Sequence, residues 1–316
     1  MELQGQHKTE LVNEPRLKSL SAFCDYNFEK LIPKFLDYAQ IELTLAPETI
    51  TKYRESLKWL TIYLPEVVDP GVLELDHIIR LKKQMLAKDL SESRVNSIIF
   101  ALRTFLIYCN DILKINTISP KEIKPMRLPK RQVIYLTVEE LLAFFAIMKT
   151  KDIRGLRMRA LSEFLAETGL RISEALSLNK EDLDWNLKEV VVIGKGNKER
   201  TAYFGERSET WLTQYLLRRK DNNPALFVTT GTAKRLTRFD LSKQFKRYAK
   251  LAGIKKKLTP HILRHTMATT LLRNGCPINY IQELLGHADL KTTAQYYLGT
   301  DKRALKEAHS KFSGFR

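Results

Sequence analysis

Four short segments in the second half of the chain carry basic, imidazole and phenol side chains at close spacing. They are ETGLRISEALSL, VVIGKGNKERTAYF, TPHILRHTMATTLL and ELLGHADLKTTAQYYLG. Guanidinium and imidazole groups can hold the oxygens of a phosphodiester, and a lysine can protonate a departing oxygen. A phenol beside such cations has its ionised form stabilised, as attack on phosphorus requires. Together these residue types indicate phosphoryl-transfer chemistry.

Arg171 and Lys195 each have a plainer interpretation as well. Arg171 follows a glycine break at the expected start of a helix, where a phosphate could bind. Glu174 lies three residues on, so an ion pair between the two is an equal alternative. Lys195 lies between two glycines that let the backbone approach a ligand closely. Lys198 and Arg200 crowd the same turn, so a basic turn that only faces water stays open.

The other two segments carry alternatives of the same kind. His261 and Arg264 are one helical turn apart and share a face, where they could hold two oxygens of one phosphodiester. His261 and His265 have the spacing of a zinc-binding helix, but the glutamate of H-E-x-x-H is absent and no third ligand is evident. We therefore expect no metal site. Tyr296 and Tyr297 are adjacent, and paired tyrosines are more often core or interface aromatics than nucleophiles.

The elements that position these segments belong to a region of mixed helices and strands that begins near residue 134. Thr137 followed by Glu140 is a capping box before the apolar run LLAFFAIM. A helix over 157–168 should end near Gly169, with helical order again over 174–178. The β-rich runs Glu189–Ile193 and Thr201–Phe204 predict a hairpin around GKGNKER. Further helices are expected at about 206–219, 238–252, 260–274, 277–285 and 290–298.

The first third of the chain has the pattern of a small helical bundle. Apolar residues recur at three- and four-residue steps from Phe28, over Thr49–Leu64, from Asp76 to about Ala87 and from Ser91 to about Ile107. Ser91 is the expected cap of the last helix. Residues 1–25 are polar and predict a loose tail or a short leading helix of little stability on its own. The stretch 113–133 mixes prolines with basic residues and lacks both hydrophobic periods, which predicts an extended linker.

Composition limits the class of protein. Lys and Arg total 53 against 36 acidic residues, and the net charge of +17 favours a polyanionic partner over ordinary metabolic chemistry. Cys24, Cys109 and Cys276 show no CxxC spacing, so neither a disulfide framework nor a zinc knuckle is expected. The N-terminus has no apolar leader, and no stretch approaches the roughly 18 apolar residues of a membrane span. We expect a soluble, unexported protein in a reducing cytoplasm.

The four segments share their motifs with a known family. R-I-S-E, G-K-G-x-K-x-R, H-x-x-R-H and L-G-H-x-x-x-x-T-T-x-x-Y, in this order over about 134–300, resemble the catalytic domain of the tyrosine recombinase or phage integrase family. The resemblance is greatest to its compact Xer-type members. It implies a catalytic set of six residues, made up of Arg171, Lys195, His261, Arg264, His287 and Tyr296.

The resemblance also implies a role for each of these residues. Arg171 and Arg264 would clamp the scissile phosphate, with the two histidines as hydrogen-bonding partners. The lysine would be the general acid that protonates the departing 5′ oxygen. Tyr296 would be the nucleophile, with Tyr297 as the alternative one residue on. Leu298 stands where the family often has a histidine, at a position outside the phosphate clamp.

The implied fold is mostly α with a small β-sheet in the catalytic domain. A helical, SAM-like core-binding domain (26–112) and an α+β catalytic domain (134–300) would form a C-shaped clamp on DNA. The tail 301–316 would dock on a neighbouring protomer, or pack on its own domain. The implied partners are double-stranded DNA with inverted half-sites and further copies of the chain, dimer to tetramer on DNA, or a related recombinase. No cofactor and no membrane are implied, and the expected location is the cytoplasm, at the nucleoid.

Three functions fit these features to different degrees. The first is a site-specific DNA recombinase with a 3′-phosphotyrosyl intermediate, either Xer-like or a mobile-element integrase. A type IB topoisomerase-like enzyme uses similar chemistry, but it needs no partner-docking tail and the Xer-like spacing of the motifs argues against it. A catalytically silent DNA-binding regulator would have lost members of the six-residue set, which is complete here.

Overall fold

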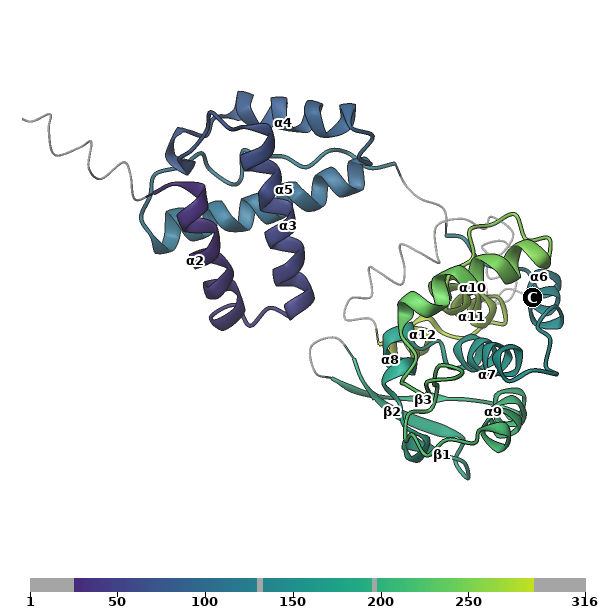
Figure 1. Ribbon diagram of the computed structural model, residues 1–316. Helices are drawn as coiled ribbons and strands as arrows, with labels where there is room; N and C mark the ends of the chain where they lie inside the picture. Colours follow the sequence, from purple (N-terminus) through teal and green to yellow (C-terminus); the bar gives the residue numbers. More distant parts are fainter. Residues whose placement is uncertain (1–25, 130–132, 195–197, 287–316) are drawn as a thin grey trace, which may run out of the picture. The chain divides into compact units, whose positions relative to one another are not determined.

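The chain divides into two compact units, Met1–Lys130 and Arg131–Arg316 (Figure 1). The computed structural model describes residues 26–129, 133–194 and 198–286. Each unit has its own cluster of buried apolar side chains, as expected for regions that each bury enough surface to fold around a core. The tails 1–25 and 301–316 and the helix expected at 290–298 lie outside the described residues.

The N-terminal unit is a bundle of α-helices, as its hydrophobic periodicity predicts. The helices are α2 (Phe28–Ile41), α3 (Pro47–Tyr63), α4 (Leu75–Ala87) and α5 (Glu92–Ile107). A 3-10 turn over Pro70–Val72 precedes α4, and a π-helical turn over Tyr108–Ile112 follows α5. Ser91 caps α5 as expected, because its side chain accepts a hydrogen bond from the backbone N–H of Arg94.

The helix over Glu92–Ile112 is long and apolar enough to cross a membrane, contrary to the expectation that no stretch of the chain is. More than half of its apolar window, 56%, is buried in the protein. Leu102, Phe105 and Leu106 have no exposed surface, and α3 and α4 pack against this helix. Core helices of soluble proteins share this composition, so the helix serves here as the centre of the bundle.

The stretch after the bundle is more closely held than the predicted linker. Residues 113–129 contain no helix or strand, as expected, but Ile123 is fully buried in the core of the N-terminal unit. The Asn96 side chain makes two hydrogen bonds to the backbone of Met126, at 2.7 and 2.8 Å, and Lys82 donates to the Lys124 carbonyl at 2.6 Å. Because isolated isoleucines form no helical or strand periodicity, the sequence alone does not reveal this packing.

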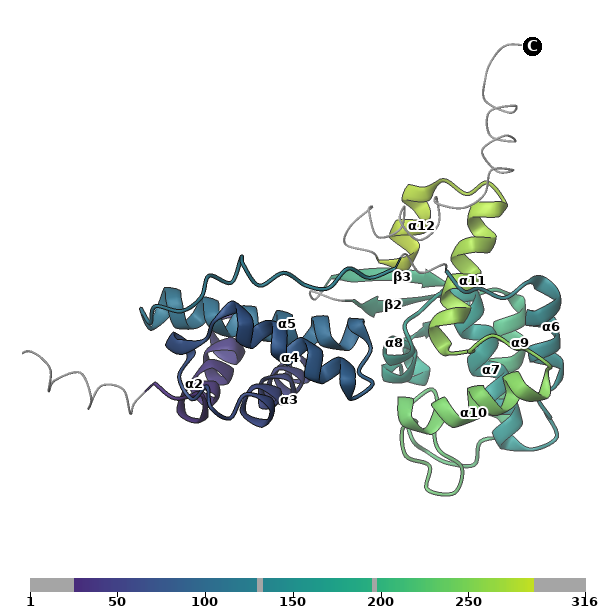
Figure 2. The same ribbon diagram turned by 90° about the horizontal axis from the view of Figure 1, so that it is seen from above.

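A buried helix, α7 (Ile153–Thr168), organises the second unit. The helices α6 (Val138–Ala146), α9 (Glu206–Arg218) and α11 (Pro260–Arg273) pack against it (Figure 2). Leu161 and Phe164 are fully buried on α7. α7 begins four residues before its predicted start because Asp152 accepts a hydrogen bond from Gly155 N–H at 2.7 Å and caps it. The predicted capping box of Thr137 and Glu140 is present at the start of α6.

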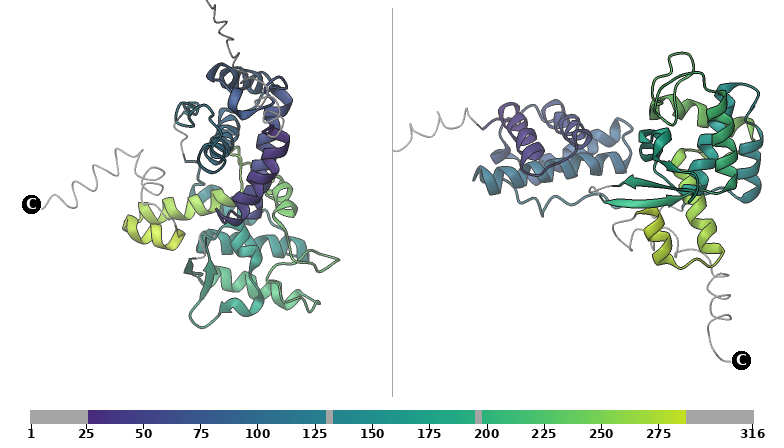
Figure 3. Two further views of the ribbon diagram at one scale, coloured as in Figure 1. Left: turned by 90° about the vertical axis from the view of Figure 1, so that its left-hand side faces the viewer. Right: turned by 90° about the horizontal axis from the view of Figure 1, so that it is seen from below.

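A three-stranded antiparallel sheet with the order β1-β2-β3 lies beside these helices (Figure 3). Its strands are β1 (Leu183–Asp184), β2 (Glu189–Ile193) and β3 (Glu199–Tyr203). The predicted hairpin is therefore confirmed, while β1 is too short to have shown a period. In the hairpin register Val190 faces Ala202 and Val192 faces Arg200. Since successive side chains alternate between faces, Arg200 shares the buried face of β3 with Ala202.

Three further α-helices lie close to their predicted bounds. They are α8 (Ile172–Ser177), α10 (Arg238–Leu251) and α12 (Ile278–Leu285). α8 contacts α10, and α12 contacts both α11 and β3. The prediction of a mostly α fold with a small sheet in the second unit is confirmed.

Candidate active site

The structure describes half of the residues that the sequence assigns to the active site. Arg171, His261 and Arg264 lie in the described part of the second unit. The others lie outside the described residues: Lys195, His287, Tyr296 and the register alternative Tyr297. The site is therefore built from the turn before α8, the first turns of α11 and the end of α12.

Arg171 stands at the turn between α7 and α8. Gly169 ends α7 with a left-handed φ of 61°, and a Cβ there would lie 2.6 Å from the Met267 sulfur, so the turn needs glycine. Arg171 then caps α8, and its backbone N–H and guanidinium each donate to the Glu174 carboxylate at 2.8 Å. The ion pair considered from the sequence is thus present, and it holds a guanidinium that is still 29% exposed.

Glu174 is the buried carboxylate of this cluster. Its side chain is 8% exposed and accepts hydrogen bonds from Arg171 and, at 2.8 Å, from Arg200 of β3. Burial alone raises the pKa of Glu174, but the hydrogen bonds from Arg200 and Arg171 outweigh burial and leave the pKa below its ordinary value. The carboxylate is therefore ionised at neutral pH and orients both guanidinium groups.

Arg264 joins the ends of two helices. It is 5% exposed, and its guanidinium donates to the carbonyl of Gly169 at 2.6 Å and to the carbonyl of Leu285. These carbonyls end α7 and α12, where a helix leaves acceptors without internal partners. Arg264 thus holds the turn that precedes Arg171 against the segment that precedes His287.

Three consecutive carbonyl oxygens at the C-terminal end of α12 accept hydrogen bonds from three different arginines. The pairs are Arg200 to Leu284 at 3.2 Å, Arg264 to Leu285, and Arg171 to Gly286 at 3.4 Å. Cations are favoured there because the carbonyl end of a helix carries partial negative charge. The arrangement fixes the chain as far as the residue before His287.

Gly286 is required by the same contacts. Its φ is +60°, and a Cβ at this position would lie 2.7 Å from Cδ and 3.0 Å from Nε of Arg200. Any other residue would therefore be strained in its backbone and would also displace the arginine. The glycine of the L-G-H motif thus lets the chain turn at the end of α12 while the Arg200 side chain packs against it.

His261 lies on the first turn of α11, near Arg264 and Arg171. Although the residue remains exposed at the surface, the protein packed around its ring lowers the pKa of His261, and the two neighbouring guanidinium groups lower it further. The imidazole is therefore neutral at neutral pH, with one nitrogen that can donate a hydrogen bond and one that can accept. His265, one turn on, also has a lowered pKa, first from burial and then from His261 and Arg264.

Arg200 is the member of the cluster that sequence reasoning missed. A basic turn facing water was one interpretation of this region, and it is wrong for Arg200, whose side chain is 8% exposed. The register explains the difference, because Arg200 pairs with the buried Val192 and points inward with Ala202. The predicted strand began at Thr201. Had it been extended by two residues towards the turn, its alternation would have placed Arg200 on the buried face with Ala202.

The cluster can bind an oxyanion at its outer edge. Arg171 and His261 are accessible there, while Arg264 and Glu174 beneath them are buried and tied to the backbone. Donors held in place before a substrate binds can stabilise charge that develops on phosphate oxygens during a reaction. Within the described ranges, His, Cys, Asp and Glu residues form no group of three that could hold a metal ion.

Sequence comparisons match the chain to known recombinases. The family model described as the phage integrase family matches residues 135–303. A tyrosine recombinase XerD of Listeria monocytogenes is 35% identical over 300 residues, covering 89% of this chain and 98% of that protein. A XerD of Haemophilus ducreyi is 33% identical over 299 residues, covering 90% of this chain and 97% of its own length.

Solved structures resemble the chain over similar lengths. A crystal structure of XerA recombinase shares 29% identity with a TM-score of 0.50 and covers 91% of this chain and 99% of its own. The Tn1549 transposon integrase, solved in complex with circular intermediate DNA, has a TM-score of 0.72 at 19% identity and covers 88% of this chain and 98% of its own. At that identity the likeness to the integrase concerns the fold alone.

Proposed function

The chain belongs to the phage integrase family and is a tyrosine-type site-specific DNA recombinase, and from this premise we propose that it cleaves DNA by attack of Tyr296 on the scissile phosphate. The ionised Tyr296 oxygen would form a bond to phosphorus while the bond from phosphorus to the 5′ oxygen breaks. Lys195 would give the proton that the 5′ oxygen takes up. The products are a 3′-phosphotyrosine and a free 5′ hydroxyl.

The second half of the reaction reverses the first on another strand. A 5′ hydroxyl of the partner strand would attack the phosphotyrosine and return its proton to Lys195, and the ionised Tyr296 oxygen would leave. The number of phosphodiester bonds is unchanged, so the cycle needs no external energy source. Arg171, Arg264, His261 and His287 would hold the nonbridging oxygens, since the charge-rich transition state is stabilised by fixed donors.

One observation above all supports this assignment of roles. Arg264 ties the turn before Arg171 to the end of α12, so two of the proposed phosphate ligands and the segment leading to His287 belong to one hydrogen-bonded cluster. His261, one turn before Arg264, lies near both arginines, which lower its pKa. Arg171 and Arg264 are 93 positions apart in the sequence. The fold therefore brings their hydrogen-bond donors together.

We assign the DNA clamp to both units. Residues 26–112 would form the core-binding domain, with the stretch up to Met126 packed on it, and 134–300 would form the catalytic domain. Lys52, Arg54 and Lys58 are exposed on α3, and contacts of this kind with phosphates give affinity without sequence preference. The solved Tn1549 integrase is itself a complex with DNA. The substrate would be double-stranded DNA with inverted half-sites.

Exchange between two duplexes requires four active sites, so we propose assembly from dimer to tetramer on DNA, with further copies of this chain or a related recombinase. The tail 301–316 would dock on a neighbouring protomer, because closed rings of like subunits need a head-to-tail contact. The proposed location is the cytoplasm, at the nucleoid.

Covalent trapping tests the proposed reaction. The full-length protein is incubated with a nicked duplex that carries a candidate site, and adducts are resolved on a denaturing gel. We expect an adduct with the wild type and none with Tyr296→Phe, while Tyr297→Phe retains it. Loss only with Tyr297→Phe would move the nucleophile by one residue. Loss with neither variant would exclude both tyrosines as the nucleophile.

A further inference from the structure

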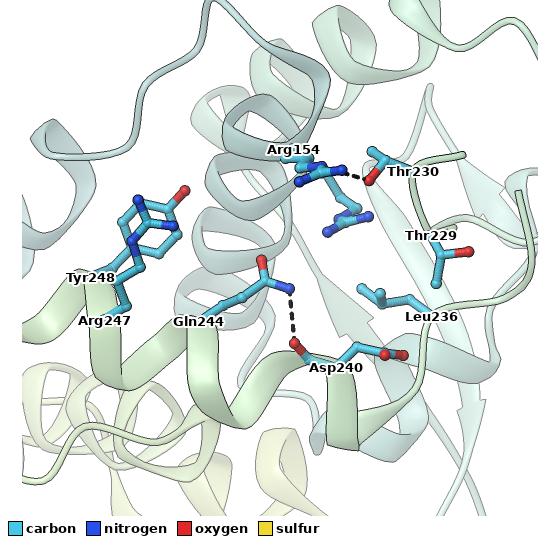
Figure 4. Close-up of a pocket in the computed structure, with 9 residues that line it drawn as sticks. Arg154, Thr229, Thr230, Leu236, Asp240, Gln244, Arg247 and Tyr248 are labelled. Atoms are coloured by element: carbon cyan, nitrogen blue, oxygen red, sulfur yellow. Dashed lines mark hydrogen bonds between the residues drawn. The ribbon is translucent and has the colours of Figure 1, made fainter. Parts of the chain in front are cut away.

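A cavity of about 340 Å³ lies on the second unit, apart from the residues of the candidate active site (Figure 4). It is bounded by the N-terminal part of α7, the loop after Phe227 and one side of α10. Three arginines line it, Arg154 and Arg157 from α7 and Arg247 from α10. Thr229 and Thr230 add hydroxyl groups, and Arg154 donates to the Thr230 hydroxyl at 2.9 Å.

Arg157 is the unusual member of this lining. It is 3% exposed, and one nitrogen of its guanidinium donates to the Val228 carbonyl at 2.7 Å, yet its Nε has no hydrogen-bond partner. A buried cation is ordinarily paired with an anion, because a neutral carbonyl alone does not make up for the hydration that the cation loses on burial. Arg154 lies close enough to oppose the charge of Arg157, and Asp240 offsets part of that effect.

Asp240, the one carboxylate among the described residues that line this cavity, offsets only part of the positive charge of the three arginines. Asp240 accepts hydrogen bonds from the backbone N–H and the hydroxyl of Thr237, at 2.9 and 2.7 Å, and thereby caps α10. Figure 4 shows its carboxylate directed away from Arg154. Three guanidinium groups against one carboxylate leave an excess of positive charge around a space large enough for a phosphate.

We propose that this cavity binds a phosphate-class oxyanion, with the buried Arg157 at its base and the exposed Arg154 and Arg247 at its rim. Guanidinium groups are suited to this because each presents several donors in one plane to phosphate oxygens. The oxyanion is supplied either by free phosphate or by a backbone phosphate of bound DNA. The second source would deepen the proposed function, and the first would be independent of it.

Thermal unfolding of the full-length protein tests the site with inorganic phosphate as the probe. At equal ionic strength, phosphate should raise the melting temperature above that in chloride, and the rise should saturate. The double variant Arg154→Gln/Arg247→Gln should weaken the apparent phosphate affinity about tenfold or more, as expected for each lost charge-assisted hydrogen bond. Lys220→Gln, an exposed change in the same unit away from the cavity, should not.

Two further measurements complete the test. Arg157→Met keeps an unbranched stem but removes the guanidinium, so the phosphate response should be lost; if this variant does not fold, the rim variant still decides. Duplex binding measured against salt separates the sources, because loss of one phosphate contact lowers the slope of log K against log salt by about one. A lower slope for the rim variant but not for Lys220→Gln indicates a DNA phosphate, and an unchanged slope with a phosphate response indicates the free ion.

The proposal is overturned if phosphate stabilises the wild type no more than chloride does and the rim variant has the salt slope of the wild type. It is also overturned if Lys220→Gln changes both readouts as much as the rim variant, since general surface charge would then explain them. Covalent trapping with Tyr296→Phe reads the proposed recombination chemistry separately, so failure of one proposal is distinguishable from failure of the other.

Discussion

Replacing Arg200 with methionine should destabilise the second unit, because the substitution keeps an unbranched side chain but removes the buried charge. The arginine side chain is 8% exposed, and it loses its 2.8 Å ion pair with Glu174 and its bond to the Leu284 carbonyl. Removing one partner of a buried pair costs about 3–5 kcal/mol when the other charge is left alone. Glu174 keeps two hydrogen bonds from Arg171, so we expect the lower end, about 3 kcal/mol.

Urea unfolding followed by tryptophan fluorescence measures this change. Trp185 and Trp211 both lie in the second unit, so a Trp59→Phe background confines the signal to it. Lys188→Met is the matched control, because it removes a surface ion pair with Glu209 at 2.9 Å and should leave the transition unchanged. Adduct formation on nicked DNA should also fall in the Arg200 variant, since the end of α12 loses one of its three arginines.

A double-mutant cycle decides whether the ion pair is the cause. If Arg200 acts through Glu174, the loss should be smaller in a Glu174→Gln background by roughly 0.5–3 kcal/mol, as found for contacting pairs. Two results would refute the reasoning. One is a loss below about 1 kcal/mol, typical of an exposed pair. The other is the same loss in both backgrounds, which would assign the effect to packing alone.

Four other outcomes follow from the same contacts. Because the folded pKa of Glu174 is lowered, its contribution to stability should be complete above its ordinary pKa and be lost as pH falls through the folded value; a Glu174→Gln variant should show a shallower acid limb in unfolding experiments. The pKa of His261, lowered in the free protein, should rise when a DNA phosphate is bound beside it, as NMR titration with and without duplex would show; no change would place the phosphate elsewhere. Cys109 is fully buried with a pKa raised to about 12, so a disulfide reagent should leave it unmodified until urea unfolds the chain. Gly286→Ala should cost roughly 1–3 kcal/mol of unfolding free energy and reduce adduct formation, because it strains the backbone and displaces Arg200; wild-type stability in this variant would contradict the contact.

Much of the architecture follows from local patterns in the chain. Apolar steps of three and four residues gave the helices of the N-terminal unit, and Ser91 and Thr137 marked helix starts because their hydroxyls bond the free N–H groups there. The hairpin followed from two β-rich runs around a glycine-containing turn. These features depend on residues close in sequence, so they can be derived without the fold.

The packing of residues 113–126 and the two-residue strand β1 could not be derived in this way. Ile123 is one apolar residue among prolines and lysines, and its burial depends on a surface that the earlier helices create. β1 is defined by its pairing with β2 rather than by its own two residues. Both depend on long-range contacts, for which a local pattern carries no signal.

The sequence by itself determined the family of this protein. The motifs that contain Arg171, Lys195, His261, Arg264, His287 and Tyr296 resemble those of the phage integrase family, and this resemblance predicted a recombinase of the family to which the chain belongs. Only the tertiary structure decided how the described part of the site is held. Arg200, outside the predicted set, reaches Glu174 and the end of α12 because the strand register turns it inward. The buried guanidinium of Arg264 bonds carbonyls 95 and 21 residues away. Distances through space, and not along the chain, set those contacts, and no local period encodes them.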